Sequence, residues 1–143
     1  MPQNEAMPRH HERPDLATDL ESMALFAGLT PEEVDDVARS IRERDVRAGK
    51  VLIKQGQWGH ELLVVLAGEV EVRRDDEILA VQGPGSVVGE TAVLNDARRN
   101  ASVVARTDVR VGVIEYTQLH ALLDTIPRLA ERLGGIVQDR NAE

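Results

Sequence analysis

The sequence predicts a mainly β fold with flanking helices: a β-barrel jelly roll with N-terminal helices and C-terminal lid helices. Between residues 45 and 115, short runs of β-branched and aliphatic residues alternate with glycine-rich or acidic turns, as in barrels and sandwiches. Before and after this region, apolar residues recur at helical spacing instead. Strands alternating with crossover helices would indicate a parallel sheet, and the sequence does not have that pattern.

The length and composition set the outer limits of this prediction. The 143 residues suffice for one domain, and we expect residues 1–15 to be a disordered tail and residues 16–143 a single domain. Hydrophobic residues make up 42% of the chain, but there is only one Phe, one Tyr and one Trp. The core is therefore expected to be aliphatic.

Several function classes are disfavoured at once. The net charge of -8 argues against general binding of nucleic acid, which depends on clustered Lys and Arg. The lack of cysteine rules out disulfides, thiolate zinc sites and a cysteine nucleophile. The N-terminus lacks the apolar segment of a signal peptide, and no run is long enough to span a bilayer. We expect a soluble, cytoplasmic protein that makes no contact with membranes.

The first helical region is predicted over residues 17–42. Thr30 suits the N-cap of a helix, Pro31 its first position, and Glu33 the third position of a capping box. The buried stripe of this helix is expected to comprise Val34, Val37, Ala38 and Ile41.

The β region contains short strand-like runs. They comprise residues 51–53, 62–66, 70–72, 78–81, 86–88, 101–105 and 109–115. Glycines or polar residues separate them, including the pair Asp75-Asp76 and the glycines from Gly56 to Gly59. Trp58 lies between those turn glycines, where its ring is expected to be exposed and to pack incidentally on the barrel rim; a contact with a partner is the alternative.

The last region is predicted to be two helices. One apolar stripe runs from Leu119 to Ile126, Pro127 interrupts it, and a second stripe runs from Leu129 to Val137. The pair Gly134-Gly135 costs about 1 kcal/mol per glycine relative to alanine. The second helix is therefore expected to fray or to hinge at this pair.

The chain carries no convincing catalytic constellation. Of the four histidines, His60 stands alone in the β region, His120 is expected on the polar side of a helix, and the other two lie in the tail. A metal site needs three or four converging ligands, so a metal-dependent jelly-roll enzyme is disfavoured. Ser86 and Ser102 have no evident base. We expect neither a metal nor a cofactor, and we do not expect an enzyme.

The segment GPGSVVGETAVLNDARRNASVV, residues 83–104, is the candidate site. A strand ending at Gly89 and followed by Glu90 and TAVL would open a helical turn, whose backbone N–H groups can bind an anion. Arg99 supplies a planar fork suited to phosphate or carboxylate. Glu90 can only accept hydrogen bonds, so its natural partners are ligand hydroxyls. Together they suggest a nucleotide site, with Arg98 as a solvated loop residue.

These residues resemble the cyclic nucleotide-binding domain of catabolite-activator-type transcription factors, protein kinase A regulatory subunits and cyclic nucleotide-gated channels. The likeness extends from about Leu25 to Leu133 and includes LFAGLTPEEVDDVA (25–38) and AGKVLIKQGQWGHELLVVLAGEVEV (48–72). The match is strongest for residues 83–105, which resemble the phosphate-binding cassette of that family.

The resemblance implies a ligand and a role for each site residue. Glu90 would hold the ribose 2′-hydroxyl and Arg99 the cyclic phosphate, Ser102 would lie near the phosphate or base, and Asn100 stands where a hydroxyl favours guanine in the family. The full set of implied ligand-binding residues is Gly89, Glu90, Thr91, Ala92, Arg99, Asn100, Ala101 and Ser102.

The function implied by the resemblance is a sensor of cyclic nucleotide, with cAMP favoured over cGMP, that signals through movement of its C-terminal helices to a protein partner or a fused effector domain. A helix-turn-helix would need roughly 60 to 80 further residues, so direct reading of DNA is not expected of this chain. The alternatives are a cGMP-selective member and a degenerate member that acts as an interaction module without nucleotide.

Overall fold

The computed structural model describes residues 14–89 and 98–141. The N-terminal part contains helix α1 (Pro14–Glu21), the 3-10 helix η2 (Ala24–Phe26) and helix α2 (Pro31–Ser40). The capping box at the start of α2 is confirmed: the Glu33 N–H donates to Thr30 Oγ1 at 3.1 Å, and the Thr30 N–H donates to Glu33 Oε1 at 2.9 Å.

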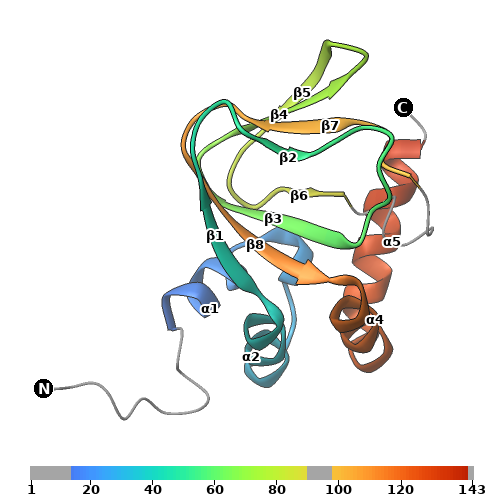
Figure 1. The fold of residues 1–143 in the computed structure, drawn as a ribbon. Coiled ribbons are helices and arrows are strands. Elements are labelled where there is room, and N and C mark those ends of the chain that lie inside the picture. Colours follow the sequence, from blue (N-terminus) through green and yellow to red (C-terminus); the bar gives the residue numbers. More distant parts are fainter. Residues whose placement is uncertain (1–13, 90–97, 142–143) are drawn as a thin grey trace, which may run out of the picture.

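Eight antiparallel strands in two sheets form the centre of the described structure (Figure 1). The strands are β1 (Arg42–Val46), β2 (Val51–Ile53), β3 (Glu61–Ala67), β4 (Val70–Arg74), β5 (Glu77–Gln82), β6 (Val87–Val88), β7 (Ser102–Ala105) and β8 (Val109–Glu115). One sheet has the order β1-β8-β3-β6 and the other β2-β7-β4-β5. The predicted jelly-roll barrel with flanking helices is therefore confirmed.

Strand β1 was not among the predicted runs. Its sequence, RERDV, is mostly charged, and four of its five residues are exposed. It pairs along its whole length with β8, from Arg42 opposite Val113 to Val46 opposite Val109. Asp45 lies opposite Arg110, which donates from Nε at 2.8 Å and thereby holds the pKa of the Asp45 carboxyl below its usual value. An exposed edge strand is defined by its partner rather than by hydrophobic alternation.

Strand β3 is buried on both of its faces. Leu62 and Val64 belong to a core shared with the helices, whereas Leu63 and Val65 belong to a core shared with the second sheet. All four are at most 2% exposed. The uninterrupted apolar run in this strand reflects burial on both sides.

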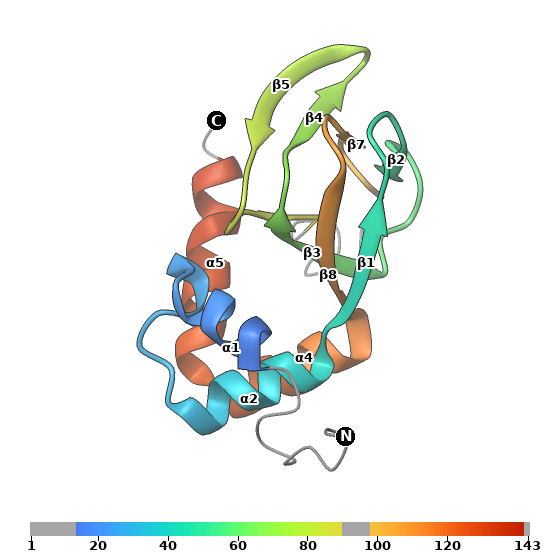
Figure 2. The same ribbon diagram turned by 90° about the vertical axis from the view of Figure 1, so that its left-hand side faces the viewer.

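The hairpin of β4 and β5 turns at Asp75 and Asp76, whose φ angles are 51° and 70°. Two consecutive residues with positive φ are typical of the tight turns that join antiparallel strands. Figure 2 shows this hairpin projecting above the rest of the barrel. The turn predicted at this pair is confirmed.

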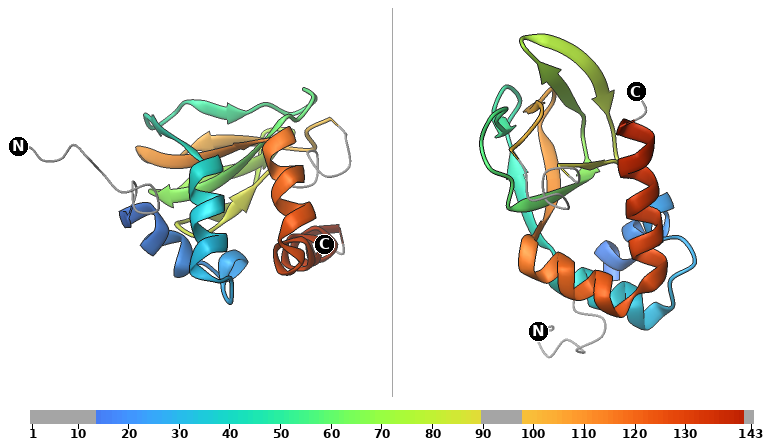
Figure 3. Two further views of the ribbon diagram at one scale, coloured as in Figure 1. Left: turned by 90° about the horizontal axis from the view of Figure 1, so that it is seen from below. Right: turned by 90° about the vertical axis from the view of Figure 1, so that its right-hand side faces the viewer.

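The C-terminal part contains α4 (Tyr116–Thr125) and α5 (Pro127–Asn141), so the break predicted at Pro127 is confirmed. Helix α5 continues through Gly134 and Gly135 without fraying there. Arg132 Nη1 donates to the Ala24 carbonyl at 2.6 Å, which fastens α5 to η2. Seen from below, α2 and α4 lie side by side beneath the first sheet (Figure 3). None of the described helices has the length and apolar character needed to cross a membrane.

Candidate functional site

Arg99 is a buried arginine at one end of the barrel. It lies three residues before β7, a central strand of the second sheet, and only 9% of its surface is exposed. A charged side chain is almost never buried to this degree without dedicated hydrogen bonds. The groups that accept hydrogen bonds from Arg99 therefore bear on its role.

The Arg99 guanidinium connects the two sheets. Its Nη1 donates to the Gly89 carbonyl at 2.9 Å, just after β6, and its Nη2 donates to the Glu61 carbonyl at 2.7 Å, at the start of β3. Both β3 and β6 belong to the first sheet. Both of these acceptors are backbone carbonyls, which orient the planar guanidinium.

Glycine is required at position 89, because the Arg99 guanidinium lies against its backbone. Its φ is +87°, a left-handed conformation that side chains rarely adopt. A Cβ at this position would lie 2.6 Å from Arg99 Nη1 and 3.1 Å from Ile53 Cδ1. Gly89 and Arg99, ten residues apart in the chain, are thus in direct contact, as two residues of one predicted site should be.

The other predicted site residues fall into two groups. Asn100 is exposed and its carbonyl accepts from Arg74 Nε at 3.0 Å, Ala101 is buried, and the Ser102 hydroxyl accepts from the Gln55 N–H at 2.9 Å. All three follow Arg99 directly in the chain. Glu90, Thr91 and Ala92 lie outside the described residues, and so does the helical turn predicted there.

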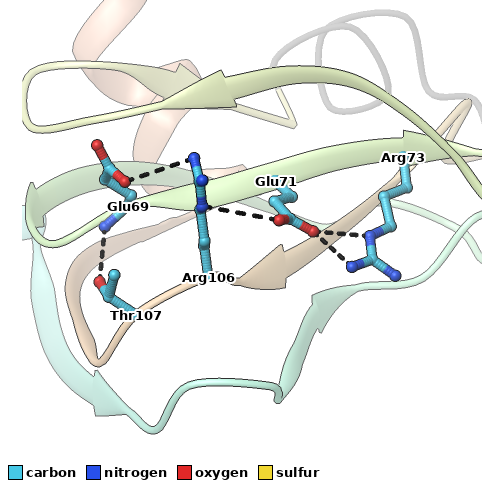
Figure 4. Close-up of polar contacts among 5 residues, drawn as sticks. All are labelled: Glu69, Glu71, Arg73, Arg106 and Thr107. Atoms are coloured by element: carbon cyan, nitrogen blue, oxygen red, sulfur yellow. Dashed lines mark hydrogen bonds and ion pairs between the residues drawn. The ribbon is translucent and has the colours of Figure 1, made fainter.

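Other arginines near the barrel surface are engaged differently (Figure 4). Arg73 Nε donates to Glu71 Oε1 at 2.9 Å, and Arg106 lies 3.8 Å from Glu69 Oε1 and 3.9 Å from Glu71 Oε2. The side chains of Arg73 and Arg106 are 41% and 50% exposed. Glu71 is only 13% exposed, but both arginines reach the solvent, where ion pairs contribute little to stability.

The two histidines that the structure describes, His60 and His120, do not belong to a metal site. Among residues 14–89 and 98–141, no group of three or more His, Cys, Asp or Glu side chains is arranged to hold a metal ion. The expectation that His120 lies on the polar side of its helix was wrong in one respect. Its ring packs on Tyr116 with centroids 4.3 Å apart, and its Nε2 is buried without a hydrogen-bond partner in the described part of the chain. Helical periodicity alone does not show that α4 is covered on this side.

Sequence reasoning missed the contacts that hold Arg99 in place. The Glu61 carbonyl and the backbone of the turn at Gly56 and Gln57 supply them. Any residue type offers a backbone carbonyl, so no sequence pattern points to it. The contact between Trp58 and Arg98 is likewise not visible in the sequence: the Arg98 guanidinium lies 5.0 Å from the centroid of the Trp58 ring.

Comparison with known proteins identifies the family of this fold and site. The family described as the cyclic nucleotide-binding domain matches residues 43–126, which include nearly all of β1, the strands from β2 to β8 and all of α4. The chain belongs to the cyclic nucleotide-binding domain family. This family is a ligand-binding regulatory domain, and the resemblance found in the sequence is confirmed.

The relatives come from different signalling proteins. The cyclic AMP receptor protein of Thermus thermophilus is 33% identical over 124 residues, which cover 83% of this chain and 57% of the relative. The cGMP-dependent protein kinase egl-4 of Caenorhabditis elegans is 37% identical over 87 residues, covering 61% of this chain and 11% of the kinase. The crystal structure of Thermus thermophilus catabolite activator protein matches with a TM-score of 0.76 and 32% identity, over 82% of this chain and 58% of that chain.

The cyclic nucleotide-binding domain therefore accounts for most of this chain, whereas the chain spans only part of each relative. It spans little more than half of the Thermus receptor and about a tenth of the kinase. The activities of those longer proteins therefore do not pass to this chain with the shared domain.

Proposed function

We propose that this domain is a cAMP sensor in which Arg99 binds the cyclic phosphate. One observation carries the proposal: a guanidinium that is nine-tenths buried and is held by the carbonyls of Gly89 and Glu61 in a fixed orientation between the two sheets. A phosphate beside it would add a negative charge and accept paired hydrogen bonds, which is the interaction that a planar guanidinium makes best.

Glu90 supplies the second contact in this proposal. It follows Gly89 directly in the sequence, and Gly89 contacts the arginine. As an acceptor, its carboxylate suits a ribose hydroxyl rather than a phosphate. The proposed ligand thus has a sugar and a phosphate held by residues nine positions apart, as the resemblance to the phosphate-binding cassette implies.

The preference for cAMP rests on two weaker supports. The Thermus relative, whose name includes cyclic AMP, covers more of this chain than the cGMP-dependent kinase does. Asn100 has no hydroxyl at the position where a hydroxyl favours guanine in the family, and the residue is exposed beside Arg99. We therefore expect cAMP to bind more tightly than cGMP.

The proposed output is a population shift of the C-terminal helices. Helix α5 is fastened to η2 by the bond from Arg132 to the Ala24 carbonyl, and it contains Gly134 and Gly135, at which it can bend. A nucleotide that contacts α5 in only one arrangement favours that arrangement by its difference in affinity. A protein partner or a fused effector domain would read the change.

Calorimetric titration with cAMP, cGMP and 5′-AMP tests the proposal. Replacing Arg99 by leucine removes its charge-assisted bonds to the phosphate. A single such bond is worth about 1.5 to 3 kcal/mol, so we expect cAMP to bind at least about 10- to 100-fold more weakly. Arg99→Lys keeps the positive charge but lacks the planar guanidinium that makes two parallel hydrogen bonds, so this variant should bind cAMP with intermediate affinity. Arg106→Leu removes an equally bulky arginine from the exposed network and should bind normally.

The possible outcomes separate the alternatives. Tighter binding of cGMP would make the domain a cGMP sensor, and binding of neither cyclic nucleotide would make it an interaction module. Unchanged cAMP affinity in a folded Arg99→Leu variant would contradict the role given to the arginine. Circular dichroism of each variant shows whether it remains folded.

A further inference from the structure

The turn after β2 is attached to the segment that contains Arg99. Gly56 and Gln57 pair with Arg99: the Gly56 N–H donates to the Arg99 carbonyl at 2.9 Å, and the Arg99 N–H donates to the Gln57 carbonyl at 2.6 Å. One residue further along, Trp58 forms an isolated antiparallel bridge with Arg98. Both backbone polar groups of Arg99 are therefore occupied by this turn.

The side chains of Trp58 and Arg98 also contact each other, beside the backbone bridge that joins these two residues. The Arg98 guanidinium lies 5.0 Å from the centroid of the Trp58 ring, within the range of a cation–π interaction. Its Nη1 also donates to the Gly56 carbonyl at 3.0 Å. We call this arrangement of Trp58, Arg98 and Gly56 the Trp58–Arg98 clip.

The clip is not needed to fill the core. Trp58 is 52% exposed, and Arg98 is exposed as well. The buried residues of both core clusters are supplied by other positions, and the only tryptophan of an aliphatic protein contributes to neither cluster. A large exposed ring that holds a neighbouring cation calls for a local explanation.

The position of the clip in the chain, next to Arg99, explains why an exposed tryptophan holds this arginine. Strand β7, which fixes the chain on the C-terminal side of Arg99, begins only at Ser102. The clip holds the chain on the other side, at the residue directly before Arg99. With both sides fixed, the guanidinium is directed toward the Gly89 and Glu61 carbonyls.

We infer that Trp58 and Arg98 are positioning residues: their clip fixes the backbone of Arg99 and so places its guanidinium for the ligand. The inference rests on the proposed function for the ligand, but the clip itself is a property of the protein without nucleotide. A preorganised binding group costs less to order when the ligand arrives. Loosening the clip should therefore weaken phosphate binding without unfolding the domain.

The first test needs no nucleotide. NMR-detected hydrogen exchange measures opening of the bond from the Arg99 N–H to the Gln57 carbonyl. Trp58→Leu and Arg98→Gln should each speed exchange of that amide about two- to five-fold, the change that loss of an exposed cation–π contact produces. Trp58→Phe and Arg98→Lys keep the ring and the cation and should restore slow exchange. Unchanged exchange in both disruptive variants would overturn the inference.

The second test measures cAMP affinity in the same variants by competitive titration. Each disruptive variant should bind cAMP about two- to five-fold more weakly. The double variant should bind no more weakly than Arg98→Gln alone, because Arg98→Gln already removes both the cation–π contact and the bond to the Gly56 carbonyl. Additive losses, or full affinity despite faster exchange, would overturn the effect on the ligand. Arg106→Gln, in the exposed network of Figure 4, is the matched control and should bind normally.

Urea unfolding and tryptophan fluorescence provide two further measurements on these variants. In urea, the free energy of unfolding of the disruptive variants should fall by no more than about 0.4 to 1 kcal/mol, the value of the same two- to five-fold change, and a larger drop would indicate a merely structural role. The chain has one tryptophan, so its emission reports on Trp58 alone, and Arg98→Gln should change that emission without nucleotide. A wild-type protein that binds no cyclic nucleotide would overturn the proposed function, whereas amide exchange would still decide whether the clip positions Arg99.

Discussion

At the scale of single residues, Gly89 and Arg99 depend on each other. The arginine needs a carbonyl acceptor from the end of β6, and the glycine provides it only because its φ of +87° turns the backbone toward the fork. The turn and the charged group are therefore one feature. A change at Gly89 should therefore alter the position of the Arg99 guanidinium.

Gly89→Ala tests this dependence. Its Cβ would meet Arg99 Nη1 at 2.6 Å, and the left-handed conformation costs a side chain about 1 to 2 kcal/mol. We expect the free energy of unfolding, measured in urea, to fall by about that amount, and cAMP affinity to fall because the guanidinium is displaced.

Gly83→Ala is the matched control for this prediction. Among residues 14–89 and 98–141, no heavy atom lies within 4 Å of its added Cβ, and its φ is outside the left-handed range. It should change neither stability nor affinity appreciably. Equal effects of the two substitutions would show that the contact between Gly89 and Arg99 is not required.

At the scale of elements, α5 combines a firm attachment with a weak point. Leu129 and Leu133 are buried, and Arg132 fastens the helix to η2. At Gly134 and Gly135, a Cβ added to the backbone would have no heavy atom of the described residues within 4 Å, so packing against this part of the chain does not require glycine there. Their presence inside a helix weakens it without an evident structural need.

Gly134→Ala and Gly135→Ala should therefore strengthen α5. Each substitution is expected to raise the free energy of unfolding by about 0.5 to 1 kcal/mol, because alanine loses less backbone entropy in a helix. If the pair is the proposed hinge, the double variant should also show a smaller change of amide exchange in α5 when cAMP is added.

Gly28→Ala is the opposing control. Its φ is +84°, and its Cβ would lie 2.7 Å from Arg128 Nη1, which belongs to α5. We expect this substitution to destabilise the protein. A loss of stability at Gly134 or Gly135 would contradict the conclusion that these positions are open.

At the scale of the whole molecule, β3 makes the helices and the barrel one unit. Leu62 faces the core that includes the helices, and Leu63 faces the core between the sheets. Neighbouring residues of one strand thus support both cores. The described structure should unfold as a single cooperative unit rather than as separate layers.

Leu62→Ala and Leu63→Ala test this unity. Each should lower the free energy of unfolding by about 2 to 5 kcal/mol, since each deletes a fully buried side chain. The unfolding transitions monitored by circular dichroism and by Trp58 emission should coincide in both variants. Helical signal lost ahead of the Trp58 signal in Leu62→Ala would show instead that the helices unfold independently.

Features with local signals could be predicted from the amino-acid sequence. The capping box at Thr30, the break at Pro127, the turn at Asp75 and Asp76 and the apolar strand β3 each follow from the conformational preferences of a few neighbouring residues. The segment from Gly89 to Ser102 could be predicted as a candidate site for a related reason, because its glycine, carboxylate and arginine have the spacing of the family's phosphate-binding cassette.

Features that depend on distant partners emerged only once the chain was folded. Strand β1 exists because β8 pairs with it, and its charged sequence gives no sign of this. The orientation of Arg99 comes from the carbonyls of Gly89 and Glu61, and the Trp58–Arg98 clip joins positions forty residues apart in the chain. Backbone carbonyls and long-range contacts leave no mark on residue type, since any amino acid supplies the former and only folding brings about the latter.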